Sequence, residues 1–255
     1  MKLIAVLLLA AAASQAQEPY SQLRADGPRT LAITYRCNPA DRAKLRQRML
    51  DNAIPRFEEW KTQGVLKDYR ILFNQYVDSE TFDMMSLLTF AKYSDVARWR
   101  EIEKTMPGGL PQDAAVLVTS AVTASLDGIR QEHAATPSPR GRSVFFLIPY
   151  DYLVPTDDYV RYLDTYVIPQ VNGWLGEGVL SAYTIYLSRY STGRAWSSLF
   201  LLEYRDAAAL GLREATVAKV REKLKRDPAW LAASESKQKI RVEKQTVIAE
   251  ELLPK

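Results

Sequence analysis

Two side chains of types that commonly bind metals or act in catalysis occur once each in the sequence, His133 and Cys37. As the only imidazole, His133 is the default candidate for a general base or for the axial ligand of a haem iron. It falls near the end of an expected strand, where the favoured interpretation is a partly exposed side chain without such a role. One histidine and one cysteine do not supply the usual ligand sets of zinc or other transition metals. We therefore expect no metal site, and haem only if His133 binds the iron.

No other motif in the sequence specifies a reaction. No Gly-x-Ser-x-Gly turn accompanies His133, and residues 107–111 form a turn without the Lys-Ser or Lys-Thr of a phosphate-binding loop. Carboxylates occur as adjacent pairs, but none lies in the spaced loop that a calcium site needs. These pairs are Glu58-Glu59, Asp157-Asp158 and Glu250-Glu251. The sequence identifies no catalytic residue and leaves open whether the protein is an enzyme.

Two expected strands carry a more promising set of polar side chains, because a strand sends alternate residues to opposite faces. The more apolar faces carry Tyr69, Ile71 and Phe73 in one strand and Tyr183, Ile185 and Leu187 in the other. We expect these faces to meet helices and the opposite faces to border the space between two sheets. The polar candidates on the opposite faces are Arg70, Asn74, Tyr76, Thr184, Tyr186, Ser188 and Tyr190.

Tyrosine, asparagine, serine and arginine at an enclosed surface suit a pocket for an aromatic or amphipathic small molecule. The alternative is a polar but filled layer between the sheets that holds no ligand. Both interpretations remain open from the sequence.

These strands belong to segments that repeat. Shifting the sequence by 114 residues aligns its halves without a gap, and nine of the 23 positions from Ile54 to Tyr76 are identical in both halves. A different shift matches residues 129–132 with residues 240–243, which places Lys244 opposite His133. The pattern predicts an internal duplication. Residues shared by the copies should serve folding, and a specific function should lie where the copies differ.

Each half has the same expected order of elements, β-α-β-β-α-β. Strands are expected at residues 30–37, 66–77, 81–93 and 126–135 in the first half and at residues 144–148, 180–190, 195–204 and 239–252 in the second. Long helices are expected at residues 41–62 and 157–175, second helices from residues 94 and 206, and a further helical stretch at residues 112–125. Pro55 and Pro169 lie inside the long helices, where each removes a backbone hydrogen bond and should kink the axis.

The β-α-β-β-α-β order resembles the ferredoxin-like unit. Together with the duplication and the shared Trp-x3-Gly-Val-Leu-x2-Tyr segment, it resembles fused members of the dimeric α/β-barrel superfamily. The resemblance implies an α+β fold in which two tandem ferredoxin-like units pack sheet to sheet and form a barrel within one chain. The expected first unit is residues 27–135, the linker is residues 136–141 and the second unit is residues 142–253.

Members of this superfamily include haem peroxidases, chlorite-degrading and haem-degrading enzymes, cofactor-free monooxygenases and ligand-sequestering proteins. The haem types need an axial histidine, which would have to be His133 here. The resemblance is not specific to any one of these families.

The N-terminus predicts export. Lys2 precedes an apolar run from Leu3 to Ala13, and small residues follow at the expected cleavage site, so residues 1–16 are typical of a secretory signal peptide. The run is shorter than the ~20 residues of a membrane-spanning helix, and no later segment is apolar enough. The net charge is +4, but basic and acidic residues alternate, so nucleic acid is not an expected partner. We expect a periplasmic or extracellular protein without a membrane span after cleavage.

Three functions remain open at this point. The leading hypothesis is an exported protein that binds a small apolar or aromatic molecule between its two sheets and needs no cofactor. The first alternative is an enzyme, either a cofactor-free monooxygenase or a haem enzyme that uses His133. The second alternative is a non-catalytic scaffold or interaction protein of the cell envelope. Neither the ligand nor the oligomeric state can be predicted from the sequence.

Overall fold

The computed structural model describes residues 27–136, 138–139, 141–190, 193 and 195–254. The expected signal peptide at residues 1–16 and two residues of the expected linker, 137 and 140, lie outside this part. Its strands are β1 Arg29–Cys37, β2 Asp68–Asn74, β3 Met84–Phe90, β4 Val118–His133, β5 Val144–Tyr152, β6 Leu180–Ser188, β7 Ser198–Tyr204, β8 Arg241–Glu243 and β9 Val247–Glu251. Its α-helices are α1 Arg42–Arg48, α2 Ile54–Thr62, α3 Val96–Glu103, α4 Gln112–Ala115, α5 Thr156–Tyr162, α6 Ile168–Gly176, α7 Ala207–Gly211, α8 Arg213–Leu224 and α9 Pro228–Ile240. No helix among the described residues is long and apolar enough to cross a membrane.

The strands form one antiparallel sheet that closes into a barrel. Its order is β7-β6-β4-β1-β3-β2-β9-β5, and pairing of β5 with β7 completes the circuit. The first half therefore contributes β4-β1-β3-β2 and the second half β9-β5-β7-β6, which is the same order in each. The short strand β8 pairs with the far end of β5, next to the barrel.

Two seams join the halves, and both consist of backbone hydrogen bonds. At one seam β4 pairs with β6, from Leu126 opposite Ser188 to His133 opposite Ala182. At the other, β2 pairs with β9 around Phe73 and Glu250. The expected barrel is confirmed: the inner faces of the two sheets pack together, and their edges are joined at the two seams. An unpaired edge strand leaves backbone groups unsatisfied, and closure removes those edges.

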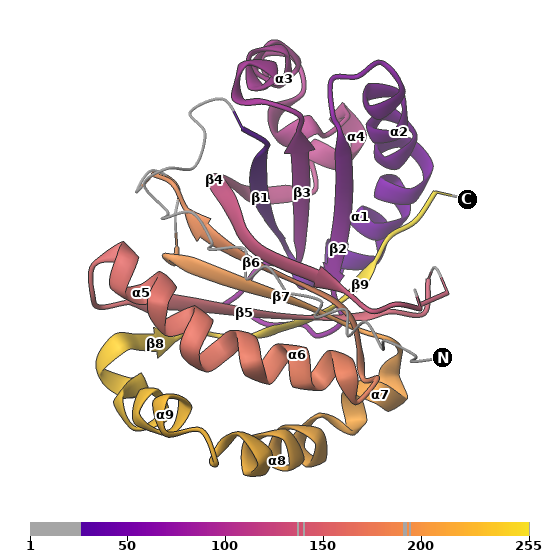
Figure 1. The fold of residues 1–255 in the computed structure, drawn as a ribbon. Coiled ribbons are helices and arrows are strands. Elements are labelled where there is room, and N and C mark those ends of the chain that lie inside the picture. The colour runs from indigo at the N-terminus through magenta and orange to yellow at the C-terminus, as the bar shows by residue number, and fades with distance from the viewer. Residues whose placement is uncertain (1–26, 137, 140, 191–192, 194, 255) are drawn as a thin grey trace, which may run out of the picture.

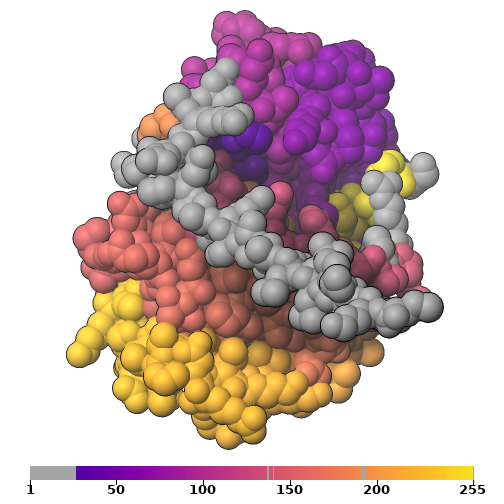
Figure 2. Space-filling model, viewed as in Figure 1, coloured from indigo at the N-terminus to yellow at the C-terminus, as the bar shows by residue number. Residues whose placement is uncertain are grey.

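Helices cover the outside of the barrel, and each half has its own helix-covered core (Figure 1). In Figure 2 the two halves form two lobes, one purple and one orange to yellow. The apolar faces predicted to meet helices do so, because Tyr69, Ile71 and Phe73 lie in the first helix-covered core and their three counterparts in the second. A third core of apolar side chains fills the barrel interior and includes Leu72, Phe145, Leu147, Leu201 and Tyr186.

The prolines inside the long helices are accommodated by wide turns. Pro55 and Pro169 occupy the first turn of α2 and α6, and a π-helical turn precedes each, over Met49–Ala53 and Leu163–Val167. The backbone N–H of Ile54 bonds to the carbonyl of Met49, five residues earlier, and Ile168 bonds likewise to Leu163. A π turn relieves the clash and the missing donor of a proline without ending the helix. The predicted irregularity is confirmed at both positions.

Two expected elements at the ends of the halves are wrong. The stretch 112–125 is helical only in α4, and β4 begins at Val118. Its alternating valine and threonine side chains favour a strand, and β1 pairs with it over most of its own length. The expected strand 239–252 is divided, because α9 continues to Ile240 before β8 and β9 follow.

The predicted register of the last strand is also wrong. In the structure Thr30 pairs with Leu126, and Val144, which lies 114 residues after Thr30, pairs with Glu250. Glu250 lies 124 residues after Leu126, so the match of residues 129–132 with residues 240–243 does not describe equivalent positions. Lys244 is therefore not the counterpart of His133.

One glycine supports the packing of the first half. Gly109 has φ +74°, and a Cβ atom there would lie 2.5 Å from Trp99 and 3.1 Å from Phe57. Both the backbone conformation and the space therefore require glycine.

We predict that Gly109→Ala lowers the free energy of unfolding by about 2–4 kcal/mol, because it combines left-handed strain with overpacking. Urea denaturation measures this change. The control is Gly176→Ala at the end of α6, where no atom lies within 4 Å of the added Cβ; it should change stability by no more than about 1 kcal/mol. Equal effects of both substitutions would contradict the packing argument.

Candidate functional site

Three of the seven sequence-predicted binding residues lie close to one end of the barrel. The guanidinium of Arg70 contacts Glu203 at 3.1 Å and Glu251 at 3.8 Å, and it lies over the ring of Phe145. Thr184 and Tyr186 border a cavity of about 520 Å³ at this end. Burial raises the pKa of the Tyr186 phenol, and the charge of Arg70 acts on it in the opposite direction. Arg70 is already satisfied by carboxylates, so it is not free to bind a ligand.

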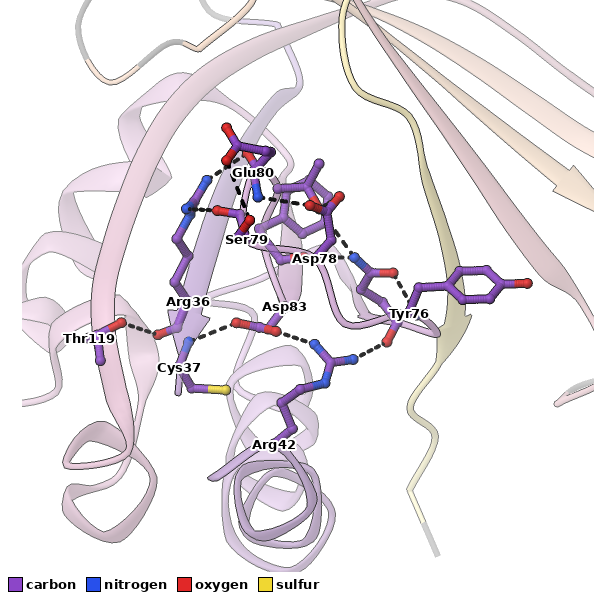
Figure 3. Close-up of polar contacts among 12 residues, drawn as sticks. Arg36, Cys37, Arg42, Tyr76, Asp78, Ser79, Glu80, Asp83 and Thr119 are labelled. Atoms are coloured by element: carbon purple, nitrogen blue, oxygen red, sulfur yellow. Dashed lines mark hydrogen bonds and ion pairs between the residues drawn. The ribbon is translucent and has the colours of Figure 1, made fainter. Parts of the chain in front are cut away.

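The other four predicted residues lie at strand ends or in turns, where two of them form hydrogen bonds and two are exposed. The Asn74 side chain bonds to Thr81 and to the carbonyl of Phe82, within the hydrogen-bonded network that includes Arg42, Asp83 and the 78–80 turn (Figure 3). The ring of Tyr76 points away from this network and is 61% exposed. Ser188 donates to the carbonyl of Tyr190, whose side chain is 47% exposed. These residues do not form one pocket.

His133 is exposed at the end of β4, opposite Ala182 of β6. It borders none of the cavities described here. The described residues also contain no group of three histidine, cysteine or carboxylate side chains that could hold a metal ion. A haem held through His133 would lie on the surface, so this residue does not fit the role of an axial ligand in an enclosed site.

Two cavities border the described apolar cores. The barrel-mouth cavity, of about 330 Å³, lies between the halves at one end of the barrel and is bordered by Phe82, Trp196 and the facing pair Ala32 and Ala124. The two cations on its rim are already paired, since Arg36 donates to the carbonyls of Ser79 and Glu80 and Lys244 pairs with Asp151.

The second cavity, here called the helix–sheet cavity, lies in the second half between the sheet and helices α6, α8 and α9. Its volume is about 270 Å³. Its lining residues are Ile148, Tyr150, Tyr166, Val167, Gln170, Val171, Trp174, Phe200, Leu202, Arg213, Arg221, Lys237, Gln238, Arg241 and Glu243. Aromatic walls with a few polar groups are typical of small-molecule sites.

A row of stacked rings forms one side of this region. Tyr159, Tyr162 and Tyr166 follow each other at helical spacing through α5 and the π-helical turn, and Tyr152 and Trp230 extend the row at its ends. Neighbouring ring centroids are 4.5 to 6.2 Å apart. The indole N–H of Trp230 donates to the carbonyl of Tyr166 at 3.0 Å, which connects α9 to the π-helical turn before α6.

Glycine allows α8 to approach closely. A Cβ atom on Gly173 of α6 would lie 2.5 Å from the Cγ1 of Val220 on α8. Arg221, next to Val220, donates from Nε to the side chain of Gln170 at 2.8 Å. The close contact of the two helices therefore brings a guanidinium to the edge of the cavity.

Three side chains that line the helix–sheet cavity carry a buried polar atom without a hydrogen-bond partner among the described residues. These atoms are the indole N–H of Trp174, Nε of Arg213 and Nη1 of Arg241. Leaving such a group unpaired costs about 1–3 kcal/mol. All three are hydrogen-bond donors.

Raised pKa values keep Tyr150, Tyr159 and Tyr162 protonated. Burial raises the pKa of Tyr159 and of Tyr162, although the nearby charge of Arg241 acts against it. Burial raises the pKa of Tyr150 in the same way, and its hydroxyl donates to Glu243 at 2.9 Å. The phenols are therefore hydrogen-bond donors at neutral pH and not bases.

The equivalent region of the first half is filled. Phe57, Trp60 and Trp99 pack with ring centroids 5.1 to 6.3 Å apart. By the shift of 114 residues, the tyrosines at 159, 162 and 166 correspond to Leu45, Arg48 and Asn52. The halves therefore differ where the cavity lies. The tyrosine spacing was a signal in the sequence, whereas the approach of Arg241 from the end of α9 was not.

No protein-family model matches the sequence, and no curated protein is similar to it in sequence. Solved structures are similar in fold. A monooxygenase-like protein from Fusobacterium nucleatum superimposes with a TM-score of 0.56 at 9% identity, covering 90% of this chain and 94% of that one. An anthrone oxidase-like protein superimposes with a TM-score of 0.55 at 11% identity, covering 89% of this chain and 91% of that one. Chlorite dismutase from Candidatus Nitrospira defluvii, in complex with imidazole, superimposes with a TM-score of 0.52 at 8% identity, covering 89% of this chain and 92% of that one.

The matches extend over nearly the whole described chain and include the closed antiparallel barrel with its outer helices. At these identities the similarity concerns architecture and carries no residue roles. The chain has the fold of the dimeric α/β-barrel superfamily.

Proposed function

We propose that the protein binds a small organic molecule with a planar ring in the helix–sheet cavity. The observation that supports this most directly is the group of unpaired buried donors around aromatic walls. A ligand oxygen or nitrogen would satisfy these donors, and a planar ring would pack against Trp174 and Phe200.

This location differs from the hypothesis of a pocket between the two sheets. The barrel interior contains a packed apolar core, and the two cations on the rim of the barrel-mouth cavity, Arg36 and Lys244, are paired. Neither feature calls for a ligand. The barrel-mouth cavity remains the competing location, and the first experiment below separates the two.

Two further expectations form part of this proposal. The N-terminal segment supports export to the periplasm or beyond, where the molecule would be bound outside the cytoplasm. The matching strand order of the halves supports a tandem duplication of a ferredoxin-like unit, in which the second copy has a cavity between its sheet and its helices.

A second candidate function is oxidation of the bound molecule without a metal. It is favoured by the similarity in fold to monooxygenase-like and anthrone oxidase-like proteins. In such a reaction an activated CH₂ group and O₂ give a carbonyl group and water, so the substrate supplies all four electrons that O₂ takes up. The cavity side chains would orient the substrate and exclude water.

Two matched substitutions locate the binding site. Gln238 lies exposed at the helix–sheet cavity and Gln245 exposed at the barrel-mouth cavity. We expect Gln238→Trp to block its cavity and weaken binding of naphthol by at least ~10-fold, about 1.4 kcal/mol, and Gln245→Trp to leave binding unchanged. Isothermal titration calorimetry measures both. The reverse pattern would place the site at the barrel mouth, and no binding by the unmodified protein would contradict the proposal.

The oxidation candidate predicts that the protein consumes O₂ when anthrone is added and forms the corresponding quinone. A metal chelator should not change the rate, and Gln238→Trp should reduce it to the background of anthrone in buffer. An oxygen electrode measures the consumption of O₂, and the quinone absorbance measures the product independently. Equal rates with and without the protein would leave binding as the only function.

A further inference from the structure

Arg241 occupies an unusual position in the helix–sheet cavity. It is the first residue of β8, directly after α9, and pairs with Tyr152 of β5. Its guanidinium carbon lies 3.9 Å from the ring centroid of Tyr150, 5.1 Å from that of Phe200 and 5.4 Å from that of Tyr162. Rings on three sides hold the cation at the cavity wall.

Other shielded arginines of this chain have acidic partners. Arg29 pairs with Asp127, Arg42 with Asp83 and Arg130 with Asp164. The last pair has two contacts, of 2.7 and 2.8 Å. A buried charge without a counterion is costly, and these pairs show how the chain normally avoids that cost.

Arg241 has no such partner. No carboxylate among the described residues forms an ion pair with it, and its Nη1 atom lacks a hydrogen bond there. The nearest phenols are those of Tyr150, Tyr159 and Tyr162, which stay protonated. Cation–π contacts compensate for part of the desolvation of a guanidinium, but they supply no negative charge.

The rest of the lining does not balance this charge. The cavity is bordered by the cations Arg213, Arg221, Lys237 and Arg241 and by one carboxylate, that of Glu243. Arg213 pairs with Glu214 outside the lining, which leaves three cations against this carboxylate. Glu243 already accepts the hydrogen bond of Tyr150. The cavity therefore combines flat apolar walls with an excess of positive charge.

From this arrangement we infer that the ligand is a planar aromatic acid, bound as its anion with the acidic oxygen against Arg241. The inference rests on the proposed binding function and specifies its ligand class. A guanidinium offers paired N–H donors that suit a carboxylate or a phenolate oxygen.

The test compares two probes of nearly equal shape, naphthoate and naphthamide, which differ in charge. We expect the unmodified protein to bind naphthoate at least ~10-fold more tightly than naphthamide, as for a hydrogen bond to a charged group. In Arg241→Met this preference should disappear, while naphthamide should bind as before. The control Arg226→Met removes an exposed arginine that does not border the cavity, and it should keep the preference.

The outcomes separate the two proposals. Tighter or equal binding of naphthamide by the unmodified protein would overturn the inference and leave the binding function intact, whereas no binding of either probe would overturn the binding function itself. The comparison in the unmodified protein does not depend on whether the variant folds. If Arg241→Met folds and keeps the full preference for naphthoate, Arg241 is not the anion partner.

A third probe distinguishes the source of the anion. Naphthol ionises only in alkaline solution, and the absorption of naphtholate differs from that of naphthol. If the site takes phenolates, the naphtholate band of the bound probe should appear at lower pH than in free solution and shift back in Arg241→Met. If only naphthoate shows a charge preference, the ligand is a carboxylate. If neither probe responds to loss of Arg241, the inference fails.

Discussion

The closure of the barrel by backbone hydrogen bonds at two seams is the constraint on which the other features depend. Pairing of β4 with β6 and of β2 with β9 removes every free edge between the halves. Closure places one set of side chains inside and the other outside, where helices must cover it. The interior fills with apolar residues, and the proposed ligand site lies on the outer side, between sheet and helices.

On that outer side the halves solve the packing problem differently. In the first half Trp99 and its neighbours fill the space over Gly109. In the second half α8 and α9 extend the helical layer, and Gly173 sets how closely α8 approaches. The added helices end at Arg241, which enters the cavity because β8 begins directly after α9. The position of the Arg241 guanidinium in the cavity therefore follows from where α9 ends.

Much of the framework could be predicted from the sequence. The alternation in β2 and β6 indicated which residues meet the helices, and the prolines at 55 and 169 indicated irregular helices. The long strand β4 could not be predicted in full, because its apolar first part becomes a strand by pairing with β1, far away in the sequence. The polar faces of β2 and β6 were predicted to line one pocket, and the contacts of their side chains could not be predicted either. Arg70 is satisfied by Glu203, which only the closed barrel brings near, and Asn74 is satisfied by Phe82 in the turn that follows its strand.

The site itself depended on both kinds of information. Three tyrosines at helical spacing were visible in the sequence, but their meaning came from Arg241, whose position depends on the length of α9 and on the break between β8 and β9. Alignment of the halves could not reveal it, because the shift of 114 residues does not hold for the last strand.

The single-chain barrel has a consequence for stoichiometry. When two identical subunits close such a barrel, a mutation changes both outer walls at once, and any cavity appears twice. Here the walls are encoded separately, so the first half can keep a dense and stable aromatic core while the second bears the energetic cost of a partly empty one. Each chain should accordingly saturate with one equivalent of ligand, and cooperativity between sites within the chain has no structural basis.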